Sequence, residues 1–187
     1  MITFIIIGIT VITSLMSFGN PKLLTALIFN PFVIQSRNQY YRFITAGLIH
    51  ADFFHLLFNM YALYLFGSIV ETSFEVIFPG FGTLLYIALY VSALIMSSTF
   101  SFYKHKENPQ YNALGASGAV SAILFASIII YPTQKLMIMP IPIPIKSYIL
   151  GPLYLLYSYY IGRNGNDNIG HDAHLLGAFW GIIFIVS

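Results

Sequence analysis

Six apolar stretches of about 20 residues divide the chain, and Pro, Gly and charged residues separate them. A helix that crosses a hydrocarbon core of roughly 30 Å needs about 20 mainly apolar residues. The pattern therefore predicts a single all-α membrane domain over residues 1–187, with no room for a separate soluble domain. Its six transmembrane helices are expected at about 2–18, 46–70, 83–103, 113–131, 143–161 and 171–187.

The connection at 19–45 is longer than a helical hairpin needs. It mixes aromatic residues with three cations, Lys22, Arg37 and Arg42. Rings and long cationic side chains are both satisfied at the surface of a bilayer, so this long first loop is expected to lie in the interface. The first apolar stretch has no basic region before it and no small-residue cleavage site after it, which predicts a retained helix rather than a removed signal peptide.

Composition agrees with a bilayer as the solvent. Only 7% of the 187 residues are Asp, Glu, Lys or Arg, whereas 58% are apolar, and soluble domains carry about 25% charged residues. These proportions exclude a soluble fold. The 17 Phe and 14 Tyr residues exclude a disordered chain, because disordered chains contain few aromatic residues. The net charge of +2 offers no patch for nucleic acid, and the lack of cysteine excludes thiol chemistry.

Polar side chains gather at one end of the even-numbered helices. The second helix holds His50, His55 and Asn59, and the last two are four residues apart on one face. The fourth opens with Gly-Ala-Ser-Gly at 115–118, and the sixth with His-Asp-Ala-His at 171–174. Helices 2, 4 and 6 run in the same direction, so these groups are expected at one membrane face.

Small residues every fourth position predict close packing of the fourth and sixth helices. They are Gly118, Ala122 and Ala126 on the fourth helix and Gly177 and Gly181 on the sixth. A hydrogen bond between Ser117 and His174 is then geometrically reasonable.

Two chemistries compete for this cluster. In one, His174 takes the proton of Ser117, which attacks a carbonyl, and His55, Asn59 and the Ser117 backbone N–H stabilise the oxyanion. In the other, the cluster's histidines ligate a metal or haem, but no His-Glu-x-x-His or cysteine motif supports this. Plain helix packing by Ser117 and interhelical hydrogen bonding by His55 and Asn59 remain simpler alternatives for each residue taken alone. Because no metal-binding motif is present, we expect no metal or cofactor.

From about Tyr41 to Gly181 the chain resembles the rhomboid intramembrane serine proteases. The family's Gly-x-Ser-Gly stands at 115–118, and its His-x-x-Gly-x-x-x-Gly stands at 174–181. Its second-helix pattern stands as His50, His55, Asn59 and Glu71. Three motifs in order on helices 2, 4 and 6 are far more specific than any one of them.

The resemblance implies a six-helix rhomboid-like bundle with a Ser–His dyad. Ser117 would be the nucleophile and His174 the base, without a third acid, so Asp172 is not recruited. The oxyanion hole would be lined by His55 and Asn59, and the supporting residues would be Gly115, Gly118, His50 and His171.

The implied activity is cleavage of peptide bonds in or near transmembrane segments of single-pass proteins. The alternative is an inactive relative that binds such segments. A multi-pass protein of the plasma (inner) membrane is expected if the source is bacterial, and the oligomeric state stays open.

The chain departs from the family's pattern at two positions. The usual Trp-Arg pair of the first loop is Tyr41-Arg42 here. Many members place an aromatic residue four positions after the nucleophile, where it stacks on the base, but this chain has Ser121. Other contacts are therefore expected to orient His174.

Orientation and access give two further expectations. Odd-numbered loops hold six basic residues and even-numbered loops only Lys135 and Lys146, which favours cytoplasmic odd loops. The resemblance implies the opposite, a cytoplasmic N-terminus and a site that opens outward, and we adopt it. Substrate is expected to enter between helices 2 and 5, with the polar loop at 163–171 as a candidate cap over the site.

Overall fold

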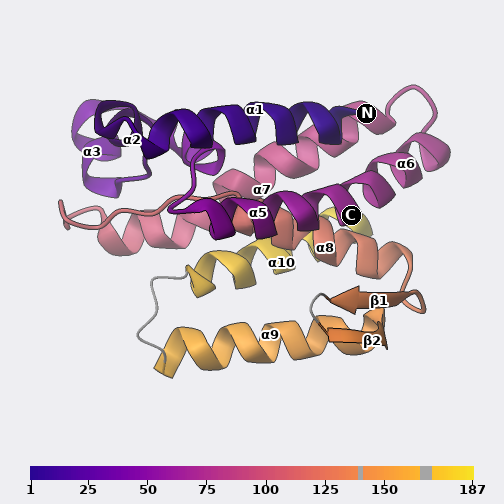
Figure 1. The fold of residues 1–187 in the computed structure, drawn as a ribbon. Helices are drawn as coiled ribbons and strands as arrows, with labels where there is room; N and C mark the ends of the chain where they lie inside the picture. The colour runs from indigo at the N-terminus through magenta and orange to yellow at the C-terminus, as the bar shows by residue number, and fades with distance from the viewer. Residues whose placement is uncertain (139–140, 165–169) are drawn as a thin grey trace.

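The computed structural model describes residues 1–138, 141–164 and 170–187 and is mostly helical (Figure 1). The elements are α1 (Ile2–Phe18), α2 (Pro21–Leu27), α3 (Pro31–Arg37), α4 (Arg42–Thr45), a 3₁₀ turn (Ala46–Leu48), α5 (Phe53–Ala62), a π-helical stretch (Leu63–Gly67), α6 (Ser68–Ile77), α7 (Gly82–His105), α8 (Ser117–Ile130), β1 (Lys135–Ile138), β2 (Ile141–Lys146), α9 (Ser147–Asn164) and α10 (His171–Val186).

The second and fourth apolar stretches begin their helices later than predicted. The second helix runs from Phe53 through Ile77. It starts at Phe53 because the Asp52 side chain accepts the backbone N–H of His55 at 2.8 Å and caps the helix there. The fourth helix begins at Ser117. Gly115, two residues earlier, has a φ of +110°, which is not a helical conformation, so the helix cannot extend back through it. Ser117 is therefore the first residue of α8 rather than part of its second turn.

Three short helices in the first loop, α2, α3 and α4, were not predicted. The first two each begin after an asparagine that precedes a proline, and the asparagine side chain accepts a backbone N–H three residues on. Asn20 caps α2 in this way at 3.1 Å, and Asn30 caps α3 at 2.9 Å. Proline at the first helical position suits the same turn. The first loop is thus folded, and only part of it is irregular.

The β1–β2 hairpin differs from the expected all-helical chain. Its strands are antiparallel, and Lys135 faces Lys146 in the register. The hairpin occupies the start of the predicted fifth helix, so α9 begins at Ser147 rather than 143. Pro142 and Pro144 cannot donate backbone hydrogen bonds, which is tolerated on an edge strand and not inside a helix.

The first helix is polar on its buried side and apolar on its exposed side. Its buried residues are Thr3, Thr10, Ser14 and Ser17. Large apolar side chains that are half or more exposed lie on the other side, among them Ile5, Ile9, Ile12 and Leu15. A soluble protein shows the reverse pattern. Hydrocarbon solvates apolar side chains and leaves small polar ones for helix contacts, so this arrangement is typical of a membrane protein.

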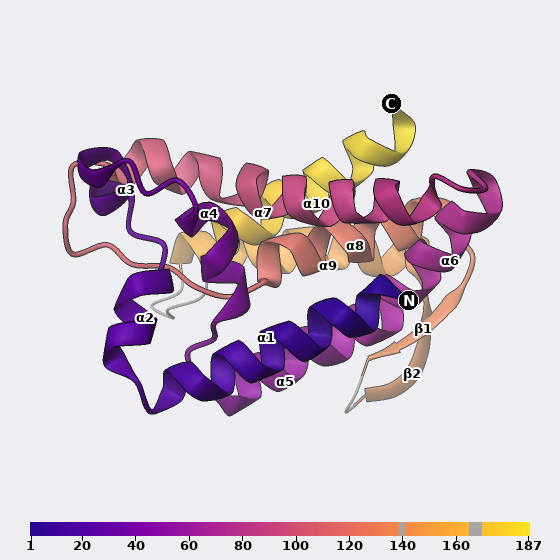
Figure 2. The ribbon, with the colours of Figure 1, turned by 90° about the horizontal axis from the view of Figure 1, so that it is seen from above.

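Within the described residues, two helices are long and apolar enough to cross a membrane, Phe53–Ile77 and Gly82–His105. The helices α1, α8 and α10 are also apolar but are shorter than these two. At the centre lies α8, where ten of 14 residues are buried, and it packs against α5, α6, α7, α9 and α10. Figure 2 shows α1 beside α5 on one side of this arrangement. The central helix is therefore the one that begins with Ser117.

Candidate active site

The small residues of α8 and α10 meet as the sequence predicts. A Cβ built on Gly177 would lie 2.0 Å from the carbonyl oxygen of Gly118, and one on Gly181 would lie 2.2 Å from that of Ala122. No side chain fits between the two backbones at these positions. One turn earlier on α10, the carbonyl oxygen of Ala173 lies 3.3 Å from the position of a Cβ on Gly118. Gly118 follows Ser117 in the sequence and Ala173 precedes His174, so this close approach of the two helices involves the sequence neighbours of both residues.

The turn before α8 packs against His55, in the first turn of α5, and against His50, in the irregular segment that precedes α5. A Cβ on Gly115 would lie 2.8 Å from Cε1 and 2.9 Å from Nε2 of His55. With its φ of +110°, this position favours glycine both sterically and conformationally. The ring centroids of His50 and His55 are 4.9 Å apart, in an edge-to-face arrangement. The sequence-predicted His50, His55 and Gly115 are thus brought together beside Ser117.

His50 connects three segments through both ring nitrogens. The Ser14 hydroxyl donates to the carbonyl of Leu48 at 3.0 Å, so its oxygen can accept from Nδ1 of His50 at 3.0 Å. Nε2 of His50 then accepts the backbone N–H of Ala116 at 3.4 Å. Only a neutral ring with its proton on Nδ1 satisfies both contacts.

Burial and the neighbouring His55 lower the pKa of His50 to about 3, against a smaller opposing effect of Asp52. His50 is only 1% exposed. It therefore has a structural role, holding the turn that leads into Ser117.

His55 and Asn59 lie one helical turn apart on α5. The Nδ1 of His55 accepts the backbone N–H of Ala51 at 3.5 Å, which leaves the proton of a neutral ring on Nε2, the nitrogen nearer to Gly115. Asn59 is buried, and its Nδ2 donates one hydrogen to the His55 carbonyl at 2.9 Å. The same nitrogen carries a second hydrogen. Both side chains thus have a donor beyond their contacts within the helix.

Two aromatic rings surround His174. Its ring lies 6.3 Å from that of Tyr154 on α9, with 28° between the planes, and 5.7 Å from that of His171, edge to face. The Tyr154 hydroxyl shares a hydrogen bond of 2.7 Å with Ser121 of α8. His171 itself is buried, at 4% exposure. Asp172 lies 3.8 Å from Lys104, where both side chains are half exposed.

The first loop supports the segment before Ser117. Phe29 and Ala113 exchange two backbone hydrogen bonds, of 3.0 and 2.9 Å. The buried guanidinium of Arg42 donates to the carbonyls of Thr25 and Ile28 at 2.8 and 2.7 Å, where α2 ends. A cation at the carbonyl end of a helix is stabilising. Arg42 therefore fixes the loop that holds the entry to α8.

Sequence reasoning missed Ser14 and Tyr154. Serine in an apolar helix is indistinguishable from a packing residue, and Tyr154 is one of several tyrosines along α9. The departure at Ser121 was the available signal, since it predicted that other contacts orient His174. The candidate cap falls mainly on 165–169, which lie outside the described residues. Among the described residues, no group of three or more His, Asp or Glu is placed to hold a metal ion.

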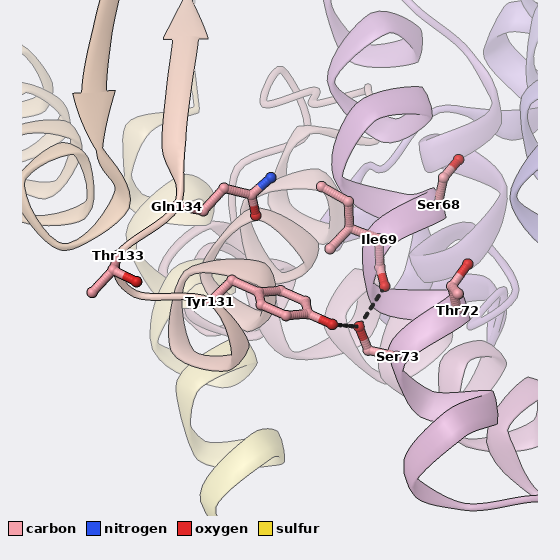
Figure 3. A pocket seen from close by; sticks show the side chains of 7 residues that line it. All are labelled: Ser68, Ile69, Thr72, Ser73, Tyr131, Thr133 and Gln134. Atoms are coloured by element: carbon pink, nitrogen blue, oxygen red, sulfur yellow. Dashed lines mark hydrogen bonds between the residues drawn. The ribbon is translucent and has the colours of Figure 1, made fainter.

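A pocket whose lining residues mostly carry hydroxyl or amide groups lies at the other end of α8 (Figure 3). It has a volume of about 640 Å³ and is lined by Ser68, Ile69, Thr72, Ser73, Tyr131, Thr133 and Gln134. The Ser73 hydroxyl donates to the Ile69 carbonyl at 2.7 Å and contacts the Tyr131 hydroxyl at 3.1 Å. The 14 residues of α8, about 20 Å of helix, separate it from Ser117. This pocket is distinct from the candidate active site.

Curated proteins similar to the chain are rhomboid proteins. RHOMBOID-like protein 12, mitochondrial, of Arabidopsis thaliana is 29% identical over 156 residues, covering 72% of this chain and 42% of the relative. Rhomboid-like protein 15 of the same plant is 31% identical over 165 residues, 81% of this chain and 38% of the relative. Rhomboid protease GluP of Bacillus subtilis is 26% identical over 145 residues, 78% of this chain and 26% of the relative. The chain thus spans less than half the length of each.

The family model for the Rhomboid domain matches residues 37–187. This range begins in the first loop and contains His50, His55, Asn59, Ser117 and His174. The chain belongs to the rhomboid family.

Proposed function

We propose that this chain is a multi-pass intramembrane serine endopeptidase that cleaves peptide bonds in or near transmembrane segments of single-pass proteins. Ser117 is the nucleophile and His174 the general base. Membership of the rhomboid family supports the reaction class, and one of the similar proteins is named a protease. The inner membrane is the expected location if the source is bacterial.

The observation that carries this proposal is the close approach of α8 and α10 at Gly118, Ala173 and Gly177. A proton can pass between a serine and a histidine only within hydrogen-bond reach, about 2.6–3.2 Å. The absence of space for any side chain between these backbones allows that reach. Ser117 and His174 are both half-buried, which leaves part of each side chain accessible to a reactant.

In the first half of the reaction, Ser117 Oγ attacks the carbonyl carbon and its proton passes to His174. The oxyanion that forms accepts hydrogen bonds from Nε2–H of His55, from the second N–H of Asn59 and from the backbone N–H of Ser117. That N–H lies in the first turn of α8, where backbone donors have no intrahelical partner. His174 then gives the proton to the leaving amine as the C–N bond breaks.

In the second half, water attacks the acyl-serine, gives a proton to His174, and releases the carboxylic acid. Ser117 regains its proton from His174, so the enzyme returns to its starting state. A helical substrate cannot undergo the first step, because its carbonyls are hydrogen-bonded and covered by side chains. The substrate segment must therefore be extended at the site of cleavage.

The test is labelling of the purified protein in detergent by a serine-directed fluorophosphonate, together with the Ser117→Ala variant. We expect covalent labelling that Ser117→Ala abolishes. Ser127→Ala is the matched control, because Ser127 is buried on the same helix and its hydroxyl donates only to the Leu124 carbonyl at 2.7 Å. Lack of labelling in the unmodified chain would instead favour an inactive relative that binds transmembrane segments.

A further inference from the structure

We propose that Tyr154 of α9 is a positioning residue for His174, and that Ser121 of α8 fixes the Tyr154 ring in place. This inference rests on the proposed function, because it concerns the orientation of the proposed base. In the family's pattern the ring comes from the helix of the nucleophile. Here it comes from a different helix, and the nucleophile's helix provides the hydroxyl that anchors it.

Ser121, the residue that anchors the ring, lies one helical turn after the proposed nucleophile Ser117 on α8. Ser121 follows Ser117 by four residues, so the two hydroxyls are on one face of α8, one turn apart. Ser121 is only 3% exposed, and its hydroxyl lies 2.7 Å from that of Tyr154. This hydrogen bond ties the phenol of α9 to α8.

The ring of Tyr154 limits how His174 can rotate. Its centroid is 6.3 Å from that of the imidazole and the planes differ by 28°, an offset stack within the usual range of aromatic pairs. His171 contacts the imidazole edge to face at 5.7 Å. An imidazole turns easily about its terminal torsion unless packing prevents it. A flat contact on one side and an edge contact on another favour one orientation of the base.

Because Tyr154 belongs to α9, the position of that helix and the orientation of His174 are coupled. The helix packs against α8 and α10 and leaves large side chains such as Leu156 and Tyr160 exposed. A displacement of α9 would carry the Tyr154 ring away from the imidazole. The position of α9 thus affects the chemical step through the orientation of His174.

The test compares variants in the rate of inactivation by a fluorophosphonate in detergent, resolved into the maximal rate constant and the half-saturating probe concentration. We expect Tyr154→Leu to lower the maximal rate constant roughly 10- to 100-fold without changing half-saturation, the effect of a misplaced catalytic group. Tyr154→Phe keeps the ring and should lose only a few-fold. Tyr160→Leu, a change of the same kind on the exposed side of α9, should match the unmodified chain.

A double-mutant cycle separates positioning from general damage to the fold. Tyr154→Phe and Ser121→Ala each break the same hydrogen bond, so the double variant should be no slower than the slower single variant. Fully multiplicative losses would overturn the anchoring role of Ser121. The cycle remains decisive if Tyr154→Leu fails to fold, which thermal unfolding in the same detergent would reveal.

The outcomes also separate this inference from the proposed function. Labelling that depends on Ser117 but is unchanged in Tyr154→Leu would overturn the positioning role and leave the protease proposal intact. Equal losses in Tyr154→Phe and Tyr154→Leu would show that the ring contact contributes nothing. Failure of the unmodified chain to be labelled at Ser117 would overturn both.

Discussion

Nε2 of His50 accepts the backbone N–H of Ala116 at 3.4 Å, across 66 residues of chain. The other ring nitrogen lies 3.0 Å from the Ser14 hydroxyl on α1. A single neutral imidazole thus ties the first helix to the residue that precedes Ser117. The cluster of histidines found in the sequence contains at least one member whose contacts are satisfied by the protein itself. This arrangement makes the geometry of the site dependent on the protonation state of His50.

We expect the protein to become less stable as the pH is lowered, because of His50. Its pKa is about 3 in the folded protein and 6.5 without the fold. Above about pH 6.5 neither state binds the proton, and below it the unfolded chain binds a proton that the folded chain does not. The free energy of unfolding should therefore fall by up to about 1.4 kcal/mol per pH unit as the pH decreases from 6.5 towards 3.

Thermal unfolding in detergent across this range measures the effect. His50→Gln is the matched variant, because its amide can donate to Ser14 and accept from Ala116 but does not titrate. Its unfolding temperature should depend less on pH than that of the unmodified chain. Parallel pH profiles for the two proteins would show that His50 does not cause the loss.

Glu71 is expected to stabilise the start of α1. Its carboxylate accepts the backbone N–H groups of Ile2 and Thr3 at 2.6 and 3.0 Å and the Thr3 hydroxyl at 2.7 Å. A buried anion at a helix N-terminus satisfies donors that have no intrahelical partner. Glu71→Ala should lower the free energy of unfolding by about 1.5–3 kcal/mol, measured by denaturant titration in detergent. Glu107→Ala, an exposed loop residue, should change it by less than about 0.5 kcal/mol. Equal effects of the two variants would contradict a capping role.

The parts of the fold that follow from local chemistry could be predicted from the sequence. Apolar runs of about 20 residues located the main helices, and the repeat of small residues identified the contact between Gly118 and Gly177. Shared helix direction placed His55 beside Gly115, whereas His50, which had been expected on the same helix, lies in the segment before α5. The catalytic roles of Ser117 and His174 remain predictions. Periodicity and small-residue spacing carry this information because each concerns one helix or one pair of helices.

The remaining features depend on contacts between distant segments. Ser14 meets His50 across 36 residues, and Ser121 meets Tyr154 across 33. Nothing in the local sequence distinguishes a serine that binds such a partner from one that only permits close packing. The start of the second helix was missed for a related reason, because apolar composition continues through the 3₁₀ turn at Ala46–Leu48 and does not reveal the cap at Asp52. Hydrophobicity shows that a membrane span exists more reliably than it shows at which residues the span begins and ends.

Gly177→Ala tests whether the approach of α8 to α10 determines stability. The added Cβ would lie 2.0 Å from the Gly118 carbonyl oxygen, which is backbone and cannot rotate away. Separating the helices should cost about 3 kcal/mol or more, at the upper end of overpacking effects. Gly8→Ala is the matched control, because nothing lies within 4 Å of its Cβ and alanine is the better helix former. The two unfolding temperatures should differ clearly, with Gly8→Ala equal to or above the unmodified chain. Similar temperatures would mean that the helices separate at little cost.

Asn59→Ala tests the proposed oxyanion hole. One N–H of Asn59 donates to the His55 carbonyl at 2.9 Å, and the second is the donor assigned to the developing oxyanion. Removal of one such donor typically slows the chemical step about 10²–10³-fold. We expect a decrease of that size in the maximal rate of fluorophosphonate inactivation, with little change in half-saturation. A loss of the structural hydrogen bond alone would lower the unfolding temperature and leave this rate constant intact. An unchanged rate constant in a folded variant would remove Asn59 from the oxyanion hole and leave His55 and the Ser117 backbone N–H as its donors.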